Sequence, residues 1–475
     1  MIIGDTMNKT KMISTVGPSS LDKEIIRGLI KSGSDVIRIN MSHSNFDEAR
    51  KIIGFVREIN YEEKLLTGIM IDTKGPEIRI GALEEKKLFL EKDKIIRVSE
   101  SEIVGNKDII SISIHGIISH VDIGGYVYLD SGKVKLEIIE KGQDVVLCKI
   151  LNDGIINQYS IVNIPNLDYD MKFLSNYDKE CIKFACENKV DYIALSYVKD
   201  HLDVLDVNDE LIGLNNNYIQ IISKIQNQSA IDDIEQIIKS SDGIMVSRGD
   251  LGLDTELERI PSIQKKIIEL TKEQDKVIII ATEMLASMRD NVRPTRAEVS
   301  DVASAVNDQV DALMLSSETA IGKYPLITVE TMKKIIESTE KEIDYLHFLR
   351  DSINKGNTIS KAISYSAVSS ANNISADAIV CSTTSGLTAK LISSYRPACP
   401  VVAISPNEYV ARGLSINYGI IPVYTRVMST TEELIELSKK AYRVMLKKDK
   451  GVIVIVGSYP LSVNYTNYMK IEEIK

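Results

Sequence analysis

The sequence predicts an α/β protein: a (β/α)8 TIM barrel with an inserted all-β lid domain and a C-terminal open α/β domain. Near-continuous runs of Val, Ile and Leu alternate with amphipathic segments. Such runs are typical of strands buried on both faces of a parallel sheet, and eight strand–helix units favour a closed barrel. The eight strands are expected at Lys11–Val16, Asp35–Asn40, Leu66–Asp72, Tyr192–Ser196, Ile219–Lys224, Gly243–Val246, Val277–Ala281 and Ala312–Leu315, with helices such as Lys23–Lys31, Phe46–Glu58 and Ala230–Ser240 between them.

The lid is predicted because the helical pattern fades between Gly75 and about Pro165. Short alternating segments with turn residues replace it, which is typical of a small β domain. A β domain inserted after the third barrel strand lies at the mouth of the barrel, where it can act as a lid. Its strands are expected at Lys87–Leu90, Lys94–Ser99, Tyr126–Leu129, Lys133–Ile139 and Asp144–Ile150.

The strand–helix pattern restarts after Tyr345 and predicts a third domain. Its strands are expected at Ala378–Val380, Val401–Ala403, Ile420–Val423 and Gly451–Val456. The expected domains are therefore the barrel (residues 1–75 and 166–344), the lid (76–165) and the C-terminal α/β domain (345–475).

The bulk composition narrows the class of protein. The chain has 475 residues, too many for one simple core, and a net charge of −10 without a long basic block. A role in coating nucleic acid is therefore not expected. The five cysteines form no CxxC pair, and no apolar run reaches membrane length. We expect a cytoplasmic protein with reduced thiols and no membrane segment.

The predicted carboxyl ends of the barrel strands carry a ring of polar residues. Active sites of such barrels lie at these ends. Positive charges gather there in an otherwise acidic protein, which suits a small phosphorylated and carboxylated ligand. The cationic residues of the ring are Arg38, Lys74, Arg79, Lys224 and Arg248.

Each of these residues also has an ordinary structural interpretation. Gly249 and Asp250 open a helix whose N–H groups can bind a carboxylate, but Asp250 can equally be a helix cap. Lys224 can be a barrel lysine whose ammonium group extends to solvent. Their occurrence on adjacent strand ends favours a binding site.

A second group offers only oxygen atoms as ligands. One carboxylate with neutral oxygens suits a monovalent cation better than zinc or a transition metal. Capping of turns by the Asn and Ser side chains is an equally good explanation at this point. The group consists of Asn40, Ser42, Asp72 and Thr73.

Several ordered motifs resemble the pyruvate kinase family over nearly the whole chain. They are Thr10-Lys11 with Gly17–Ser20, Arg38–His43, Asp72–Arg79, Met245–Gly252, Arg293–Ala303 and Met314–Ala320. The resemblance implies phosphoryl transfer from phosphoenolpyruvate to ADP, giving pyruvate and ATP in glycolysis. It also implies Mg²⁺ or Mn²⁺ and K⁺ as cofactors, and a homotetramer.

The resemblance also implies roles for individual residues. Lys224, Thr282 and Arg38 would be catalytic, and Arg38, Lys224, Gly249, Asp250 and Thr282 would bind phosphoenolpyruvate. His43 and Arg79 would contact the nucleotide, and Asp250 would hold Mg²⁺ or Mn²⁺. The K⁺ ligands would be Asn40, Ser42, Asp72 and Thr73.

The chain departs from the family at the metal site. Gln226 stands where the family has a glutamate ligand, and Glu283 stands where the family usually has glutamine. Losing one charge beside the metal would cost a few kcal/mol at an effective dielectric of about 20, or on the order of 10²-fold in affinity or rate. We hypothesise that the negative charge has moved to Glu283. In a regular strand, however, Thr282 and Glu283 would point to opposite faces.

Further departures leave an alternative function open. Ser160 replaces a nucleotide-contacting lysine, Ser131 an aspartate and Ser317 a glycine of the family. The alternative to an active kinase is a catalytically weak paralogue that binds metabolites or regulates a partner. The C-terminal domain keeps a hydroxyl-rich loop, which the family uses for sugar-phosphate effectors and which can equally be a capped helix start. Its residues are Ser382, Thr383, Thr384, Ser385, Gly386 and Thr388.

Overall fold

Eight parallel strands close into a barrel in the computed structural model, which describes residues 8–165, 167, 172–351, 358–460 and 465–475. The strand order around the barrel is β1-β17-β16-β15-β14-β13-β3-β2. The predicted barrel is confirmed, and each strand lies within two residues of its expected bounds. The strands are β1 (Lys11–Val16), β2 (Val36–Asn40), β3 (Gly68–Asp72), β13 (Tyr192–Leu195), β14 (Gln220–Ile225), β15 (Gly243–Ser247), β16 (Val277–Ala281) and β17 (Ala312–Leu315).

The barrel strands read as apolar runs because both of their faces are buried. One core fills the barrel interior and a larger one lies between the strands and the outer helices. The predicted helix 230–240 is interrupted at Asp233, whose side chain accepts hydrogen bonds from His201. The main outer helices are α1 (Lys23–Ser32), α2 (Phe46–Glu63), α3 (Asn176–Glu187), α4 (His201–Gly213), α5 (Gln228–Asp232), α6 (Ile234–Ser240), α8 (Ile260–Glu273), α9 (Arg296–Asn307) and α11 (Pro325–Glu340).

The inserted region is made mainly of strands and has its own apolar core. A seven-stranded sheet has the order β4-β12-β8-β9-β10-β6-β7, and β11 pairs with β5. The five expected segments are strands. Four further strands of two to four residues were not predicted, because they are too short to show an alternation of apolar and polar residues. The strands are β4 (Ile78–Arg79), β5 (Lys87–Leu90), β6 (Ile95–Ser99), β7 (Ile109–Ser111), β8 (Tyr126–Leu129), β9 (Val134–Lys141), β10 (Val145–Ile150), β11 (Gly154–Asn157) and β12 (Ile161–Asn163).

The C-terminal region is an open α/β sheet with the order β20-β19-β18-β21-β22. Its last strand is antiparallel to β21 and was not predicted, because its charged sequence is typical of a sheet edge. The elements are α12 (Tyr345–Asp351), α13 (Ile359–Asn373), β18 (Ala378–Ser382), α14 (Leu387–Ser394), β19 (Val401–Ser405), α15 (Glu408–Arg412), β20 (Ile420–Tyr424), α16 (Thr431–Leu446), β21 (Gly451–Gly457) and β22 (Tyr468–Ile474).

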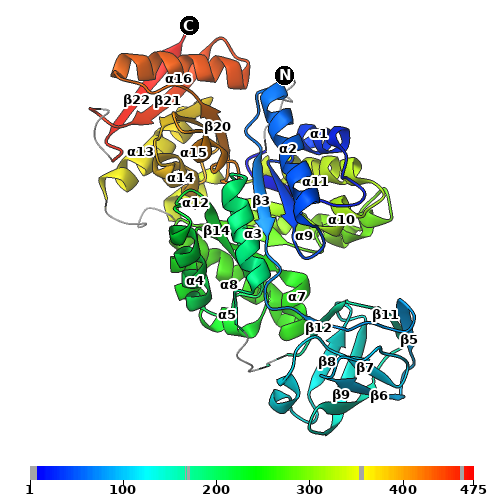
Figure 1. The fold of residues 1–475 in the computed structure, drawn as a ribbon. Coiled ribbons are helices and arrows are strands. Elements are labelled where there is room, and N and C mark those ends of the chain that lie inside the picture. Colours follow the sequence, from blue (N-terminus) through cyan, green and yellow to red (C-terminus); the bar gives the residue numbers. More distant parts are fainter. Residues whose placement is uncertain (1–7, 166, 168–171, 352–357, 461–464) are drawn as a thin grey trace.

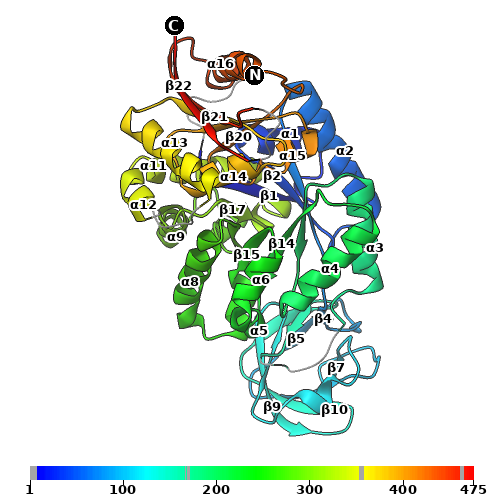
Figure 2. The same ribbon diagram turned by 90° about the vertical axis from the view of Figure 1, so that its left-hand side faces the viewer.

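The lid and the C-terminal region lie at opposite ends of the barrel. Figure 1 shows the lid in cyan at one end and the C-terminal region in yellow to red at the other, and Figure 2 agrees. Two buried arginines tie the C-terminal region to residues just before barrel strands. Arg412 Nε lies 2.9 Å from Asp191 Oδ1, and Arg396 makes two 2.9 Å bonds to Asp311. The carboxyl ends of the strands are therefore left to face the lid.

The lid touches the barrel through a turn that contains Gly132. This glycine has a left-handed φ of 82°, and a Cβ built on it would lie 2.6 Å from Leu253 Cδ2. Leu253 belongs to α7 (Arg248–Asp254), which directly follows β15. A glycine is needed here for both reasons, because it permits the backbone conformation and leaves room for the helix.

All five cysteines are unpaired, and burial raises the pKa of Cys148 and Cys381 to about 12. Among the described residues, no helix has both the length and the apolar character that crossing a membrane requires.

Candidate functional site

A buried ionic cluster lies at the carboxyl ends of four neighbouring strands. Asp72 Oδ2 accepts hydrogen bonds from Arg38, 2.7 Å from Nε and 2.6 Å from Nη2. Asp72 Oδ1 accepts bonds from Lys224 Nζ at 3.0 Å and from Ser196 Oγ at 2.9 Å. Lys224 Nζ also lies 2.8 Å from Ser196 Oγ. One carboxylate thus holds a guanidinium and an ammonium group side by side.

The order of the strands explains why these side chains meet. β2, β3, β13 and β14 are consecutive neighbours in the barrel, and in the register Asn40 and Ala194 both pair with Asp72. Arg38 Nη1 reaches Thr15 Oγ1 of β1 at 2.9 Å, which fixes the far side of the guanidinium. Thr15 and Ser196 were not predicted as site residues. Reading the ends of the first and fourth strands as well would have found them.

Asp72 is ionised in this setting. Complete burial opposes ionisation, but the charges of Arg38 and Lys224 outweigh it and lower the pKa of the carboxyl group. Two cations share one anion, so the cluster has a formal charge of +1. A phosphorylated anion at this position would be attracted by both cations without having to displace a one-to-one ion pair.

A second polar group lies at the ends of β15 and β16. Gly249 N–H donates to Thr282 Oγ1 at 2.9 Å, and Thr282 Oγ1 donates to the carbonyl of Ala281 at 2.6 Å. Arg248 donates to both carboxylate oxygens of Asp301 and to the carbonyl of Thr282. Arg248 is therefore a structural link between α7 and α9. Gly249, Asp250 and Thr282, which were predicted to bind one ligand, are brought together.

Thr282 and Glu283 both leave the regular strand. Their φ angles are 67° and 55°, a left-handed conformation that costs residues other than glycine on the order of 1–3 kcal/mol each. The rule of alternating faces therefore does not apply to this pair. The carboxyl carbon of Glu283 lies 3.9 Å from the position that a Cβ on Gly249 would occupy, and Thr282 Oγ1 lies 3.5 Å from it. Both side chains thus approach the same glycine.

Gln226 is buried beside Asp250 and hydrogen-bonded at both ends of its amide. Its Oε1 accepts from the backbone N–H of Tyr197 at 2.8 Å, and its Nε2 donates to Asp250 Oδ2 at 2.6 Å. The backbone donor fixes which end is the oxygen, because a reversed amide would place NH₂ against N–H. Gln226 thus presents a donor, and not an oxygen ligand, to the space beside Asp250.

The four residues predicted to bind K⁺ lie on the ends of β2 and β3, but their oxygens already have partners. Asn40 Oδ1 accepts from the Ser42 backbone N–H at 3.1 Å, which is the turn-capping role. Ser42 Oγ donates to Glu77 Oε1 at 3.1 Å. The Asp72 carboxylate faces Arg38 and Lys224.

Thr73 completes this group. Its Oγ1 donates to the carbonyl of Ala194 at 3.3 Å, and its carbonyl accepts from Ser196 Oγ at 2.7 Å. The arrangement offers neutral oxygens, the Asp72 carboxylate within the group, and a further nearby carboxylate, that of Glu77. Within the described part of the chain, there is no group of three or more His, Cys, Asp or Glu side chains that could hold a metal ion.

Arg79 and His43 lie near the junction of lid and barrel. Arg79 Nε donates to Glu77 at 2.8 Å and Arg79 Nη1 donates to the Tyr159 carbonyl at 2.7 Å. Burial raises the pKa of Glu77 even though Arg79 opposes this effect. The pKa of His43 is lowered, first by partial desolvation and then by the charges of Arg79 and Arg38. His43 is therefore held mostly neutral at pH 7 and can act as a hydrogen-bonding group.

The hydroxyl-rich loop of the C-terminal region precedes α14, as predicted. Gly386 has a φ of 89°, and its N–H donates to Thr383 Oγ1 at 2.9 Å. Thr388 Oγ1 lies 2.7 Å from Thr466 Oγ1. Thr384 and Ser385 are exposed and Ser382 is half-buried. The loop is thus closed internally by Thr383, and the exposed hydroxyls face solvent.

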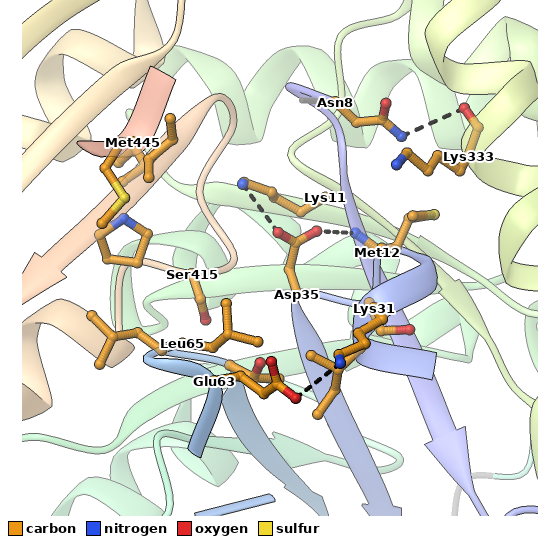
Figure 3. A pocket seen from close by; sticks show the side chains of 18 of the residues that line it. Asn8, Lys11, Met12, Lys31, Asp35, Glu63, Leu65, Lys333, Ser415 and Met445 are labelled. Atoms are coloured by element: carbon orange, nitrogen blue, oxygen red, sulfur yellow. Dashed lines mark hydrogen bonds and ion pairs between the residues drawn. The ribbon is translucent and has the colours of Figure 1, made fainter. Parts of the chain in front are cut away.

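A separate cavity of about 220 Å³ lies at the other end of the barrel, between β1, β2 and the C-terminal region. Figure 3 shows Lys11 and Asp35 in its wall, joined by a 3.1 Å ion pair, with the Met12 N–H donating to Asp35. Burial raises the pKa of Asp35. Because these residues lie at the start of the strands, the cavity is separate from the cluster around Asp72.

Together, these features define a class of protein: a (β/α)8 barrel with a separate region made mainly of strands, an α/β C-terminal region and a cationic cluster at the carboxyl ends of the barrel strands, where such barrels carry their active sites. Comparison with known proteins identifies the family. The family description "Pyruvate kinase, barrel domain" matches residues 7–329, and "Pyruvate kinase, alpha/beta domain" matches residues 361–472. The chain belongs to the pyruvate kinase family.

Individual relatives agree over the full length. The chain is 38% identical to a pyruvate kinase of Clostridium perfringens, with 98% of this chain and 100% of the relative covered. It is 39% identical to that of Clostridium acetobutylicum, with 99% and 100% covered. The crystal structure of a pyruvate kinase from Cryptosporidium parvum is 34% identical, with a TM-score of 0.91, and covers 99% of this chain and 97% of that chain.

Proposed function

We propose that this chain is a catalytically active pyruvate kinase, which transfers the phosphoryl group of phosphoenolpyruvate to ADP and yields pyruvate and ATP in glycolysis. The observation that supports this proposal most strongly is the pairing of Arg38 and Lys224 on the single carboxylate of Asp72. Phosphoryl transfer depends mainly on positioning and on neutralisation of charge, and this cluster supplies both. No finding favours the catalytically weak paralogue.

The cluster residues have distinct roles in this proposal. Arg38 binds the phosphoryl group while its bond to the enol oxygen breaks and a bond to a β-phosphate oxygen of ADP forms. Lys224 stabilises the negative charge left on the enolate oxygen. Asp72 and Ser196 hold the Lys224 ammonium group in place. The enolate is then protonated at its terminal carbon by water near Thr282, which gives pyruvate.

The substrate carboxylate is proposed to bind at Gly249, Asp250 and Thr282. The Gly249 N–H and the Thr282 hydroxyl already bond to each other, so the carboxylate would share or replace that bond. His43 and Arg79 are proposed to contact ADP, because they lie beside the lid. Closure of the lid would exclude water and bring these residues to the nucleotide.

Two kinds of cation fit the oxygen-rich donor set. Asp250 provides a carboxylate of the type that Mg²⁺ or Mn²⁺ prefers, and the bound cation would neutralise phosphoryl charge. The neutral oxygens of Asn40, Ser42 and Thr73, with Asp72, are proposed to hold K⁺. Glu77 would contribute charge near that site.

Further properties follow from family membership and are proposals for this chain. They are the barrel (1–75 and 166–344), lid (76–165) and C-terminal (345–475) domain boundaries, a homotetramer, a cytoplasmic location and no nucleic-acid partner. A phosphorylated effector is proposed to bind at Ser382–Thr388, where two hydroxyls are exposed.

An assay that couples pyruvate formation to NADH oxidation tests the proposed function. The protein should form pyruvate from phosphoenolpyruvate and ADP with Mg²⁺ or Mn²⁺, and faster with K⁺. Lys224→Met should lower kcat by at least about 10³-fold, because the enolate loses its counter-charge. Turnover of the unaltered protein that is no faster than that of Lys224→Met would refute the proposal.

A further inference from the structure

A further cavity, of about 380 Å³, lies between the barrel and the C-terminal region. Its wall is formed by the end of α3, the segment that follows α4 and one residue of α15. The barrel segments precede β13 and β14, so the cavity lies at the amino ends of the strands, away from the cluster around Asp72. Its volume is within the range typical of small-molecule sites, about 300–1,000 Å³. Buried Val190 and Ile219 contribute apolar surface to it.

Two tyrosines from different parts of the chain line this cavity and stack on each other. The ring centroids of Tyr218, before β14, and Tyr409, in α15, lie 5.3 Å apart, with 20° between the ring planes. Tyr218 is still 52% exposed, so part of its ring remains open to a ligand. Aromatic side chains presented in this way bind planar rings by stacking.

The tyrosine pair is held in place by contacts behind it. The guanidinium carbon of Arg412 lies 4.9 Å from the centroid of the Tyr409 ring, and Arg412 Nε bonds to buried Asp191 at 2.9 Å. On the other side, Asn216 Oδ1 accepts from the backbone N–H of Tyr218 at 3.0 Å. The rings are therefore positioned before any ligand arrives, which reduces the ordering cost of binding.

The charged residues of the cavity favour an anion. Two lysines, Lys183 and Lys189, and one glutamate, Glu187, line it. Lys183 lies 4.0 Å from Glu187, whereas Lys189 makes no ion pair with any described residue and its ammonium group lies 5.9 Å from the Tyr409 ring centroid. The aromatic rings alone would also suit an organic cation, but the two lysines would repel it.

We propose that this cavity binds a small planar aromatic anion, whose ring stacks on Tyr218 and whose anionic group lies beside Lys183 and Lys189. A nucleotide and an aromatic carboxylate share this chemistry. A ring without charge, or a phosphate without a ring, would use only one half of the site. The site is independent of the proposed function, because none of its residues takes part in that reaction.

The reactivity of Cys186 reports on this cavity directly. Cys186 lines the cavity and is partly exposed, and burial raises the pKa of its thiol. Alkylation by iodoacetamide is therefore followed at about pH 9, where more of the thiol is ionised, with mass spectrometry of the peptide that contains Cys186. Because the readout belongs to one residue, binding elsewhere on the chain is distinguished from binding here.

Four probes at equal millimolar concentration separate the two halves of the site. AMP or 4-aminobenzoate should slow the alkylation of Cys186 about fivefold once the probe exceeds its Kd about fourfold. The more effective of the two shows whether the anionic group is a phosphate or a carboxylate. Adenosine lacks the charge and ribose 5-phosphate lacks the ring, so each should slow the reaction by less than about twofold.

Two tyrosine variants of the full-length protein complete the test. Tyr218→Leu should raise the concentration of the protecting probe needed for half-maximal protection on the order of tenfold, because the ring loses its stacking partner. Tyr61→Leu is the matched control, since Tyr61 is 88% exposed and lies outside the cavity, and it should change that concentration by less than about twofold.

Three results would overturn the proposal. The first is that neither AMP nor 4-aminobenzoate protects Cys186. The second is that adenosine or ribose 5-phosphate protects it as well as they do. The third is that Tyr218→Leu behaves like Tyr61→Leu, which would show that protection arises from binding at another place.

Discussion

Replacing Asp72 by asparagine should destabilise the barrel strongly, because Asp72 is the only carboxylate within hydrogen-bond reach of Arg38 and Lys224 in the described structure. The two charge pairs are 2.6 Å and 3.0 Å long. At an effective dielectric of about 20, each attraction amounts to about 6 kcal/mol before desolvation is counted. Removing one partner of a buried pair costs about 3–5 kcal/mol, and here two cations lose theirs. We expect a loss of at least about 3–5 kcal/mol at pH 7.

Urea unfolding followed by circular dichroism measures this loss. Asp47→Asn is the control, because Asp47 also pairs with an arginine, at 2.9 Å, but its side chain is 93% exposed. The control should change stability by less than about 1 kcal/mol. If Asp72→Asn costs no more than the control, the ionic cluster does not hold the barrel mouth together and the argument from it fails.

The same substitution has a pH signature. Because the folded-state pKa of Asp72 is lowered, its stabilising contribution is complete above the ordinary carboxyl pKa of about 3.9 and disappears as the pH falls through the lower folded value. The stabilities of Asp72→Asn and of the unaltered protein should therefore converge only in strong acid. Convergence already at pH 6 would show that Asp72 is not ionised as described.

Two further predictions concern the outer barrel and the lid. Burial raises the pKa of Asp203 to about 6, so the cost of ionising this carboxyl group in the folded protein grows between pH 4 and pH 6. Asp203→Asn should therefore increase the free energy of unfolding in urea at pH 7.5 by up to about 3 kcal/mol. At pH 4 the same variant should leave that free energy unchanged. An equal gain at both pH values would contradict this account. Gly132→Ala should loosen the contact between lid and α7 more than Gly124→Ala does. Both glycines have a left-handed φ, but only a Cβ at Gly132 would meet another side chain, that of Leu253, within 4 Å. Hydrogen exchange of residues 76–165 compares the two variants, and equal exchange rates would show that the contact is unimportant.

The barrel could be predicted closely from the sequence because its strands are buried on both faces. A run such as Val277–Ala281 has no polar residue to obscure its ends, and the observed strand has the same bounds. The short lid strands could not be predicted in the same way. Ile78–Arg79 is a two-residue strand, and its pairing with β12 joins Arg79 to Ile161, which lies 82 residues later in the sequence (161 − 79).

The site could be predicted in part. Arg38, Asp72 and Lys224 follow from reading the strand ends, and the structure brings them together. The bridging role of Ser196 depends on which strands are neighbours. The direction of Glu283 could not be predicted at all, because two consecutive left-handed residues break the alternation that the sequence argument assumes.

The orientation of Gln226 is a second example of the same limit. A glutamine beside an aspartate can offer either its oxygen or its amide nitrogen. The choice here is made by the backbone N–H of Tyr197, which only the folded chain places beside the glutamine oxygen. Residue types therefore indicated which groups belong to the site, whereas tertiary contacts decide which atom each group presents.

The measurement that tests the central claim most directly is ³¹P NMR of phosphoenolpyruvate and ADP with the purified protein, Mg²⁺ and K⁺. The account predicts that the phosphoenolpyruvate signal declines while the γ-phosphate signal of ATP grows in equal amount, and that Lys224→Met abolishes both changes. Loss of the phosphoenolpyruvate signal to inorganic phosphate, or no change with the unaltered protein, would contradict it.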